Sequence, residues 1–439
     1  MYLHGTSRIN ELGHLEIGGV DTVKLAEQYG TPLIIYDEAY IRQKCRAFVS
    51  AFREKGVKAQ VAYASKAFSS IAMCQLVKEE GLSLDVVSSG ELYTALKADF
   101  PESKIHFHGN NKTIEELELA LQADIGCYVV DNFYELELLH QLASERKKRV
   151  NILLRITPGV EAHTHEFIST GQEDSKFGFD LASGQVKKAL ELALQSPYYH
   201  VLGLHCHIGS QIFETDGYVL AIKKIAASLD EWERELNWQL TVLNVGGGFG
   251  IRYAEGDTPL DLKEYVYAIC DQVTSEWTKR GKAVPEIWIE PGRSLVGDAA
   301  TTIYTVGSQK EIPGVRHYLA VDGGMRDNLR VALYQAKYEA ALANRMNEKP
   351  TKLYTVAGKL CESGDILIKD IYLPEVKPGD LLAVSCTGAY GYAMANNYNR
   401  VRRPAVLFVE DGQAKLVVRR ESLEDLIRND LPLPAKVNL

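Results

Sequence analysis

The sequence lacks the features by which secreted and membrane proteins are usually recognised. Its seven cysteines are odd in number, lie far apart and never form a C-x-x-C pair. This pattern fits thiols kept reduced in a cytoplasm better than it fits a disulfide framework. No apolar run approaches the roughly 18 residues of a membrane-spanning helix. The start, MYLHGTSRINELGHLEIGG, has no basic stretch followed by an apolar one, so no signal peptide is expected and a cytoplasmic location is predicted.

An excess of positive charge is also missing. The chain carries 49 Lys and Arg residues against 58 Asp and Glu, a net charge of −9, and shows no basic block. A nucleic acid is therefore not an expected partner. With 439 residues, of which 46% are hydrophobic and 24% charged, the chain is long enough for two domains.

Eight short apolar runs alternate with longer amphipathic stretches between residues 38 and 290. Strands that alternate with helices predict right-handed βαβ units and a parallel sheet. Eight such strands in about 250 residues predict a (β/α)8 TIM barrel, with a doubly wound sheet as the alternative. The predicted strands are residues 60–65, 82–87, 105–109, 127–131, 151–156, 201–206, 241–246 and 286–290.

The pattern changes after residue 290. Closely spaced strand-like runs with Gly and Pro between them predict an antiparallel β domain over residues 291–439. Within it, only residues 331–345 show helical spacing. The segment 1–37 is too short for a domain and ends in an apolar run, so we expect it to pack on the β domain. The predicted strands of that domain are residues 301–309, 317–324, 364–373, 380–388, 405–410 and 414–420.

Polar and ionisable residues gather where the predicted barrel strands end. The active site of such a barrel forms at the C-terminal ends of its strands, so these residues are candidates for a single site. They are Lys66, Asp85, Ser88, His108, Arg155, the HCHIGS segment (205–210), the GGGFG segment (246–250) and the EPGR segment (290–293).

Two of these features together indicate a cofactor. Three consecutive glycines let backbone N–H groups approach a phosphate, although alone they often mark only a turn. Lys66 alone would be a lysine that snorkels to the barrel mouth. A desolvated lysine beside a phosphate cradle is instead the arrangement for a Schiff base with pyridoxal phosphate. Glu290 would then keep the pyridine nitrogen protonated, and His207 would lie flat against the ring.

The sequence resembles the fold-type III pyridoxal-phosphate decarboxylases, and among them the diaminopimelate decarboxylases. The resemblance rests on segments that include YASKA, HCHIGSQI, NVGGGFG, EPGRSLVG, CESGD and GAYGYAMANNYN. It implies a (β/α)8 barrel plus a β domain, and a homodimer whose active sites are shared between subunits. The implied reaction is the decarboxylation of meso-2,6-diaminopimelate to L-lysine and carbon dioxide with pyridoxal 5'-phosphate, the last step of lysine biosynthesis.

The resemblance also implies roles for the residues at matching positions. Lys66 would form the Schiff base, and Cys361 of the partner subunit would be the general acid. Besides Lys66, the cofactor-binding residues would be His207, Ser210, Gly246, Gly247, Gly248, Glu290, Pro291, Gly292, Arg293 and Tyr390. The substrate-binding residues would be Arg293, Arg330, Tyr334, Glu362 and Tyr390.

The chain departs from the family pattern at Ser89, where glycine is usual, and at Val331, where proline is common. Neither change removes a functional group. A different decarboxylase of this fold, acting on ornithine, arginine or carboxynorspermidine, is one alternative. Enzymes for basic amines typically carry aspartate where this chain has Glu362. A non-catalytic homologue is another alternative, although such relatives usually lose the residues present here as Lys66 and Cys361.

A metal site is the rival interpretation of the histidines. His205 and His207 stand two residues apart on a predicted strand, so their side chains would share a face and would be able to chelate a metal. His163 and His165 have the same spacing. A barrel metallohydrolase would not, however, need Lys66 and the glycine cradle together, and no metal is predicted.

Overall fold

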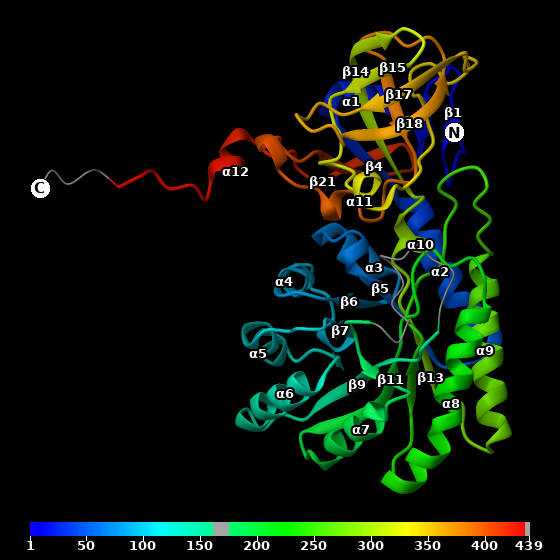
Figure 1. The fold of residues 1–439 in the computed structure, drawn as a ribbon, viewed down its shortest axis with the longest axis vertical. Helices are drawn as coiled ribbons and strands as arrows, with labels where there is room; N and C mark the ends of the chain where they lie inside the picture. Colours follow the sequence, from blue (N-terminus) through cyan, green and yellow to red (C-terminus); the bar gives the residue numbers. More distant parts are fainter. Residues whose placement is uncertain (161–174, 435–439) are drawn as a thin grey trace, which may run out of the picture. The chain divides into compact units, whose positions relative to one another are not determined.

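The computed structural model describes residues 1–160 and 175–434 and contains two compact units. One unit is Ala39–Ala299, and the other combines Met1–Glu38 with Ala300–Leu439 (Figure 1). The sequence prediction placed the corresponding boundaries after residues 37 and 290. His163 and His165 lie outside the described residues.

The Ala39–Ala299 unit contains a closed barrel of eight parallel strands. The pairing of the last strand with the first and of β8 with β9 completes the ring, which confirms the predicted barrel. The short β10 (Phe179–Asp180) pairs beside β9. The barrel strands are β5 (Ala59–Ala64), β6 (Ser83–Val86), β7 (Ile105–Phe107), β8 (Cys127–Val130), β9 (Val150–Thr157), β11 (Tyr199–His205), β12 (Val242–Asn244) and β13 (Glu286–Ile289).

The barrel helices begin close behind the strands because polar residues cap them there. Side-chain oxygens of Ser70, Ser88, Thr113 and Asn132 accept backbone N–H groups in the first turns of four helices. The loops in front of these four helices are therefore short, whereas the loops that carry the HCHIGS and GGGFG segments, after β11 and β12, are longer. The helices are α2 (Glu38–Lys55), α3 (Ile71–Glu79), α4 (Ser89–Lys97), α5 (Ile114–Ala123), α6 (Phe133–Glu145), α7 (Gln185–Gln195), α8 (Asp216–Leu236), α9 (Leu262–Lys279) and α10 (Arg293–Val296).

The second unit is built on a mixed sheet. Most neighbouring strands are antiparallel, as predicted, but the β15–β17 and β20–β4 pairs are parallel. The second exception arises because β4, from the N-terminal segment, lies between β14 and β20. The sheet runs in the order β18 (Ile366–Leu373), β17 (Lys352–Ala357), β15 (Arg316–Val321), β14 (Ala300–Ile312), β4 (Leu33–Asp37), β20 (Ala405–Glu410) and β21 (Gln413–Val418), and β19 (Leu381–Val384) pairs with β14.

The predicted helix over residues 331–345 is wrong for most of its length. A short helix, α11 (Arg330–Tyr334), ends at Gln335, whose φ is +53°. The chain then forms β16 (Ala340–Leu342), which pairs with β19. Burial of Tyr338 and Leu342 and pairing with β19 outweigh the helical spacing of the sequence.

Smaller elements are β1 (Arg8–Ile9), β2 (Leu15–Ile17), β3 (Val20–Asp21), α1 (Thr22–Tyr29) and α12 (Leu423–Ile427).

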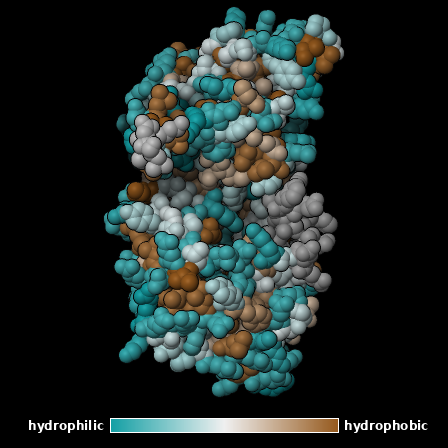
Figure 2. Space-filling view, turned by 60° about the vertical axis from the view of Figure 1, so that its left-hand side comes forward, coloured by the Kyte–Doolittle hydropathy of each residue, from teal (hydrophilic) through white to brown (hydrophobic). Residues whose placement is uncertain are grey.

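On the face shown in Figure 2, hydrophilic residues surround small separate groups of hydrophobic ones. Within residues 1–160 and 175–434, no helix is both long and apolar enough to cross a bilayer.

Candidate active site

Lys66 lies just beyond the end of β5, in a single 3-10 turn formed by Ser65–Ala67. Its side chain is exposed, so the prediction of a desolvated lysine is wrong for this structure: the turn carries the residue past the buried strand. Gly292 packs closely against this turn, next to Ala64 and Ala67. The charge of Lys66 lowers the pKa of His207, though less than desolvation does. The loops after β5, β11 and β13 therefore meet around this lysine.

Glu290, directly after β13, is the centre of a nearly buried polar cluster. Its carboxylate accepts a hydrogen bond from Asn244 Nδ2 at 2.5 Å and contacts His205 Nε2 at 3.0 Å. His108 Nε2 lies 3.4 Å away, between Glu290 and Asp85. Burial and the charge of Asp85 raise the pKa of Glu290, but the two histidines outweigh them, and the net pKa is lowered. The carboxylate is thus held ionised inside the barrel.

The three glycines follow β12 and lie between neighbouring loops. A Cβ on Gly247 would overlap the carbonyl oxygen of Glu290, and one on Gly246 would lie 2.9 Å from His207 Nδ1. Glycine is required here by the close approach of these loops. The N–H of Gly246 donates to Asn244 Oδ1 at 2.9 Å, and that of Gly247 donates to His207 Nδ1 at 3.2 Å. Gly248, with φ of +99°, completes the segment.

Arg293 is buried at the start of α10, in the EPGR segment. Its guanidinium donates to Ser210 Oγ at 2.9 Å and to the hydroxyl of Tyr253 at 2.5 Å. The carbonyl of Pro291 accepts the N–H of Ala64 at 3.1 Å, which ties this segment to β5. Arg293 and Ser210 are therefore together, as predicted residues of one site, and the arginine aligns the two loops.

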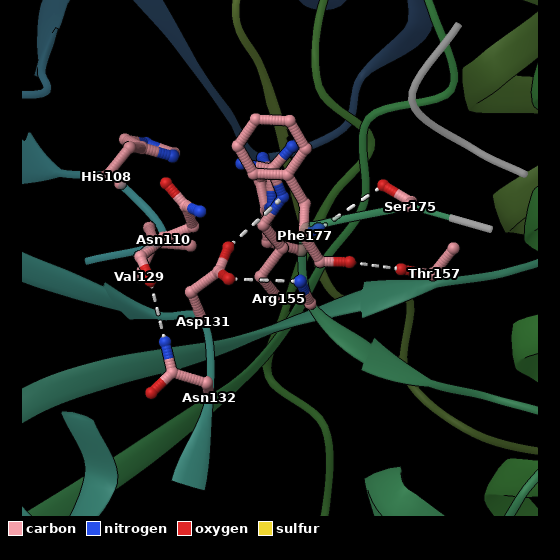
Figure 3. Close-up of polar contacts among 12 residues, drawn as sticks. His108, Asn110, Val129, Asp131, Asn132, Arg155, Thr157, Ser175 and Phe177 are labelled. Atoms are coloured by element: carbon pink, nitrogen blue, oxygen red, sulfur yellow. Dashed lines mark hydrogen bonds and ion pairs between the residues drawn. The ribbon is translucent and has the colours of Figure 1, made fainter. Parts of the chain in front are cut away.

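A second group of polar contacts lies at the ends of β8 and β9. Figure 3 shows the carboxylate of Asp131 facing the guanidinium of Arg155, with Nε and Oδ1 3.7 Å apart. The guanidinium lies 4.1 Å from the centre of the Phe177 ring, and Gly178 N donates to Asp131 at 3.1 Å. Thr157 Oγ1 donates to the carbonyl of Phe177 at 2.5 Å. Asp131 therefore orients Arg155 at the rim, a role that the sequence analysis missed.

The histidines do not form the pair that the metal hypothesis requires. Among the residues described, the group with metal-ligand spacing is His108, His205 and Glu290, whose ligand atoms lie within 4.8 Å of one another. His207 is not part of this group, and its Nδ1 accepts a hydrogen bond from the N–H of Gly247. This group adjoins the glycine loop, and its carboxylate, that of Glu290, is able to bind the pyridine nitrogen of a cofactor.

In the other unit, the CESGD segment forms an exposed loop. Cys361 and Glu362 are exposed, whereas Asp365 is 3% exposed. The Asp365 carboxylate accepts the N–H groups of Met325 at 2.6 Å and Leu360 at 2.9 Å. Asp365 N donates to the carbonyl of Glu362 at 3.0 Å. A buried carboxylate thus fixes the backbone that presents the cysteine and the glutamate to the outside.

The remaining predicted substrate residues lie in the same unit. Arg330 is buried and donates to the hydroxyl of Tyr338 at 2.6 Å. Tyr334 is half-buried at the end of α11. Tyr390, also half-buried, has a φ of +60°. Val331 lies within α11, and Ser89 begins α4, where its N–H donates to Glu116, so both departures from the family pattern are accommodated in helices.

Comparison with known proteins extends this picture over the whole chain. A family model described as the pyridoxal-binding domain of pyridoxal-dependent decarboxylases matches residues 38–297. The chain is 65% identical over 437 residues to a diaminopimelate decarboxylase of Bacillus subtilis, with 100% of each sequence covered. It belongs to the diaminopimelate decarboxylase family. The same family includes a Halalkalibacterium halodurans protein that is 63% identical over 439 residues, again with 100% of each covered.

A solved structure agrees with this family assignment. The diaminopimelate decarboxylase of M. jannaschii, in complex with L-lysine, has a TM-score of 0.91 and 36% sequence identity to this chain. The match covers 97% of this chain and 98% of that one. Both the barrel and the mixed sheet are thus shared with the family.

Proposed function

We propose that this chain decarboxylates meso-2,6-diaminopimelate to L-lysine and carbon dioxide with pyridoxal 5'-phosphate. The observation that carries the proposal is the full-length identity of 65% to a diaminopimelate decarboxylase. The geometry agrees with it, because an amine, an ionised carboxylate and a glycine loop meet at one rim of the barrel. Such a reaction would belong to lysine biosynthesis.

The residues at the rim fit the cofactor. Pyridoxal phosphate offers an aldehyde, a pyridine nitrogen and a phosphate, and when bound its protonated ring withdraws electrons from the carbon that loses carbon dioxide. Lys66 would hold the aldehyde carbon, and Glu290, which accepts hydrogen bonds from Asn244 and contacts His205, would hold the proton at the pyridine nitrogen. We assign the phosphate to Gly248, Gly292 and Arg293, because the N–H groups of Gly246 and Gly247 already have acceptors in the protein.

The CESGD loop would complete the site. Cys361 and Glu362 are exposed in this loop and would be able to enter the active site of a second subunit. We therefore infer a homodimer with shared sites. Cys361 would return a proton to the reacting carbon. Glu362 would bind the distal ammonium of the substrate, and Arg330 would bind its distal carboxylate. Tyr334 and Tyr390 would be further substrate-binding residues. Binding of the distal end orients the bond that breaks.

We also infer a cytoplasmic location. All seven cysteines are free, and six of them are buried. Thiols of this kind are typical of a reducing compartment.

The direct test is to incubate the protein with pyridoxal phosphate and meso-diaminopimelate and to measure lysine release. Ornithine, arginine and LL-diaminopimelate serve as competing substrates. A site that binds a charged distal group discriminates against analogues without it by about four orders of magnitude. Ornithine turnover at a comparable rate would instead favour a basic amino-acid decarboxylase.

Reduction with borohydride tests the assignment of Lys66. The cofactor should become fixed to that residue, and peptide mapping should find it there. Lys66→Ala should retain part of its cofactor affinity, through the phosphate, and lose nearly all turnover. A label on another lysine would refute the assignment.

A further inference from the structure

Asn244, the last residue of β12, is fully buried and bonds in two directions. Its Nδ2 donates to Glu290 Oε1 at 2.5 Å, and its Oδ1 accepts the N–H of Gly246 at 2.9 Å. The backbone closes a triangle, because Glu290 N donates to the carbonyl of Gly246 at 2.9 Å. One side chain therefore links the carboxylate to the first glycine of the loop.

The chemistry of the two contacts requires an amide of this length. Glu290 is held ionised and offers only acceptors, whereas the Gly246 N–H offers only a donor. Reversing the amide would place oxygen against oxygen and N–H against N–H, so the orientation is set by the partners. Aspartate would keep the acceptor but lose the donor, and leucine, of similar size, would lose both.

We propose that Asn244 is a positioning residue that sets both ends of the cofactor site. It aims the carboxylate of Glu290 at the pyridine nitrogen, and it holds the glycine loop in the shape that receives the phosphate. His205 and His108 also approach Glu290, at 3.0 Å and 3.4 Å. Asn244 differs from them in bonding the loop as well. This inference rests on the proposed cofactor.

Two variants separate the two functions. In Asn244→Asp the contact to Gly246 remains, while a second carboxylate faces Glu290; like charges at this distance shift pKa values by about one unit or more. In Asn244→Leu both contacts are lost. Asn151→Asp, the same change at an exposed position on β9, is the matched control. Circular dichroism and thermal unfolding first establish that each variant is folded.

The measurements use the apoprotein titrated with pyridoxal and with pyridoxal phosphate. The ratio of the two dissociation constants reports the contribution of the phosphate. Asn244→Asp should keep this ratio, but should shift the pH dependence of the bound cofactor's visible absorbance by about one unit or more. Asn244→Leu should reduce the ratio by about tenfold, as expected for a loop that has lost a buried hydrogen bond. The control should match the wild type in both.

The proposal fails if Asn244→Asp shows the wild-type absorbance profile or if Asn244→Leu keeps the wild-type ratio. Should the leucine variant not fold, Asn244→Ser, too short to reach both partners, takes its place. These outcomes differ from a failure of the proposed function. A wild-type protein that binds pyridoxal phosphate but releases no lysine would refute the substrate while leaving the role of Asn244 intact.

Discussion

Burial separates one cysteine from the other six. Cys361 is exposed in the CESGD loop, and the others are buried. Burial raises the pKa of Cys45, Cys74, Cys206 and Cys270 to about 12. Because the thiolate is the reactive form, these thiols are both inaccessible and protonated at neutral pH. Cys361 is therefore the thiol suited to chemistry.

Thiol labelling tests this distinction at the scale of single residues. At pH 8, Ellman's reagent should react with at most one cysteine per native chain, and with all seven after unfolding. Cys361→Ser should abolish the native reaction. Any shielding of Cys361 in a dimer would appear as slower labelling at higher protein concentration. Rapid labelling of two or more cysteines in the folded protein would contradict the assignment.

At the scale of elements, a buried ion pair joins the loop that follows β7 to the first turn of α6, the helix that follows β8. Lys112 Nζ lies 2.7 Å from Glu135 Oε1, and their side chains are 1% and 2% exposed. The ammonium also donates to the carbonyls of Gly109 and Val129, and Glu135 Oε2 accepts the N–H of Asp131. The pair thus supports the backbone that places Asp131 at the rim.

Removing the lysine should leave an uncompensated buried carboxylate. Lys112→Met should lower the free energy of unfolding by about 3–5 kcal/mol at pH 8. Burial raises the pKa of Glu135, and loss of Lys112 removes the charge that opposes this. A carboxyl group whose folded-state pKa is raised destabilises the fold as pH rises from its unfolded pKa through its folded one. The loss should therefore be smaller at pH 5 than at pH 8.

Urea denaturation of both proteins at the two pH values measures this difference. Lys187→Met is the matched control, because Lys187 pairs with Glu231 and Glu235 on the surface. Such exposed pairs contribute about 0–1 kcal/mol. If Lys112→Met lowers the free energy of unfolding equally at pH 5 and pH 8, the ionised Glu135 carboxylate is not the cause of the destabilisation.

At the scale of the whole molecule, the proposed dimer takes Lys66 and Cys361 of each site from different subunits. Lys66→Ala and Cys361→Ala should each be nearly inactive. When the two variants are combined under conditions where subunits exchange, about half of the dimers would contain one subunit of each variant. Each such dimer has one site with both Lys66 and Cys361 and one site with neither. Activity should return to roughly one quarter of that of the wild type.

Mass spectrometry should verify exchange, and the residual activity of Cys361→Ala must be subtracted. If exchange is complete and activity stays at the level of the single variants, Cys361 acts within its own subunit or has no catalytic role. Mixing Lys66→Ala with a second inactive barrel variant, Glu290→Ala, is the control. Lys66 and Glu290 of each site come from the same subunit, so every site in a dimer of the two variants lacks one of them, and no activity should return.

The sequence by itself determined the barrel and most of the residues placed at its rim. Strands buried between helices must be apolar throughout, so each appeared as a short apolar run. Polar residues at the strand ends then necessarily share one rim, because parallel strands in a barrel all point the same way. The motifs at these ends also carried the resemblance to the family.

The tertiary structure alone decided the features that depend on distant residues. The strand pairing of residues 340–342 and the parallel pairing of β4 with β20 are set by neighbours far along the chain. The exposure of Lys66 follows from the turn that ends β5. Asn244 and Glu290 are 46 residues apart, and only closure of the barrel brings the amide to the carboxylate. Local pattern reports which residues are buried, but hydrogen bonds between strands depend on register and distance, which the fold supplies.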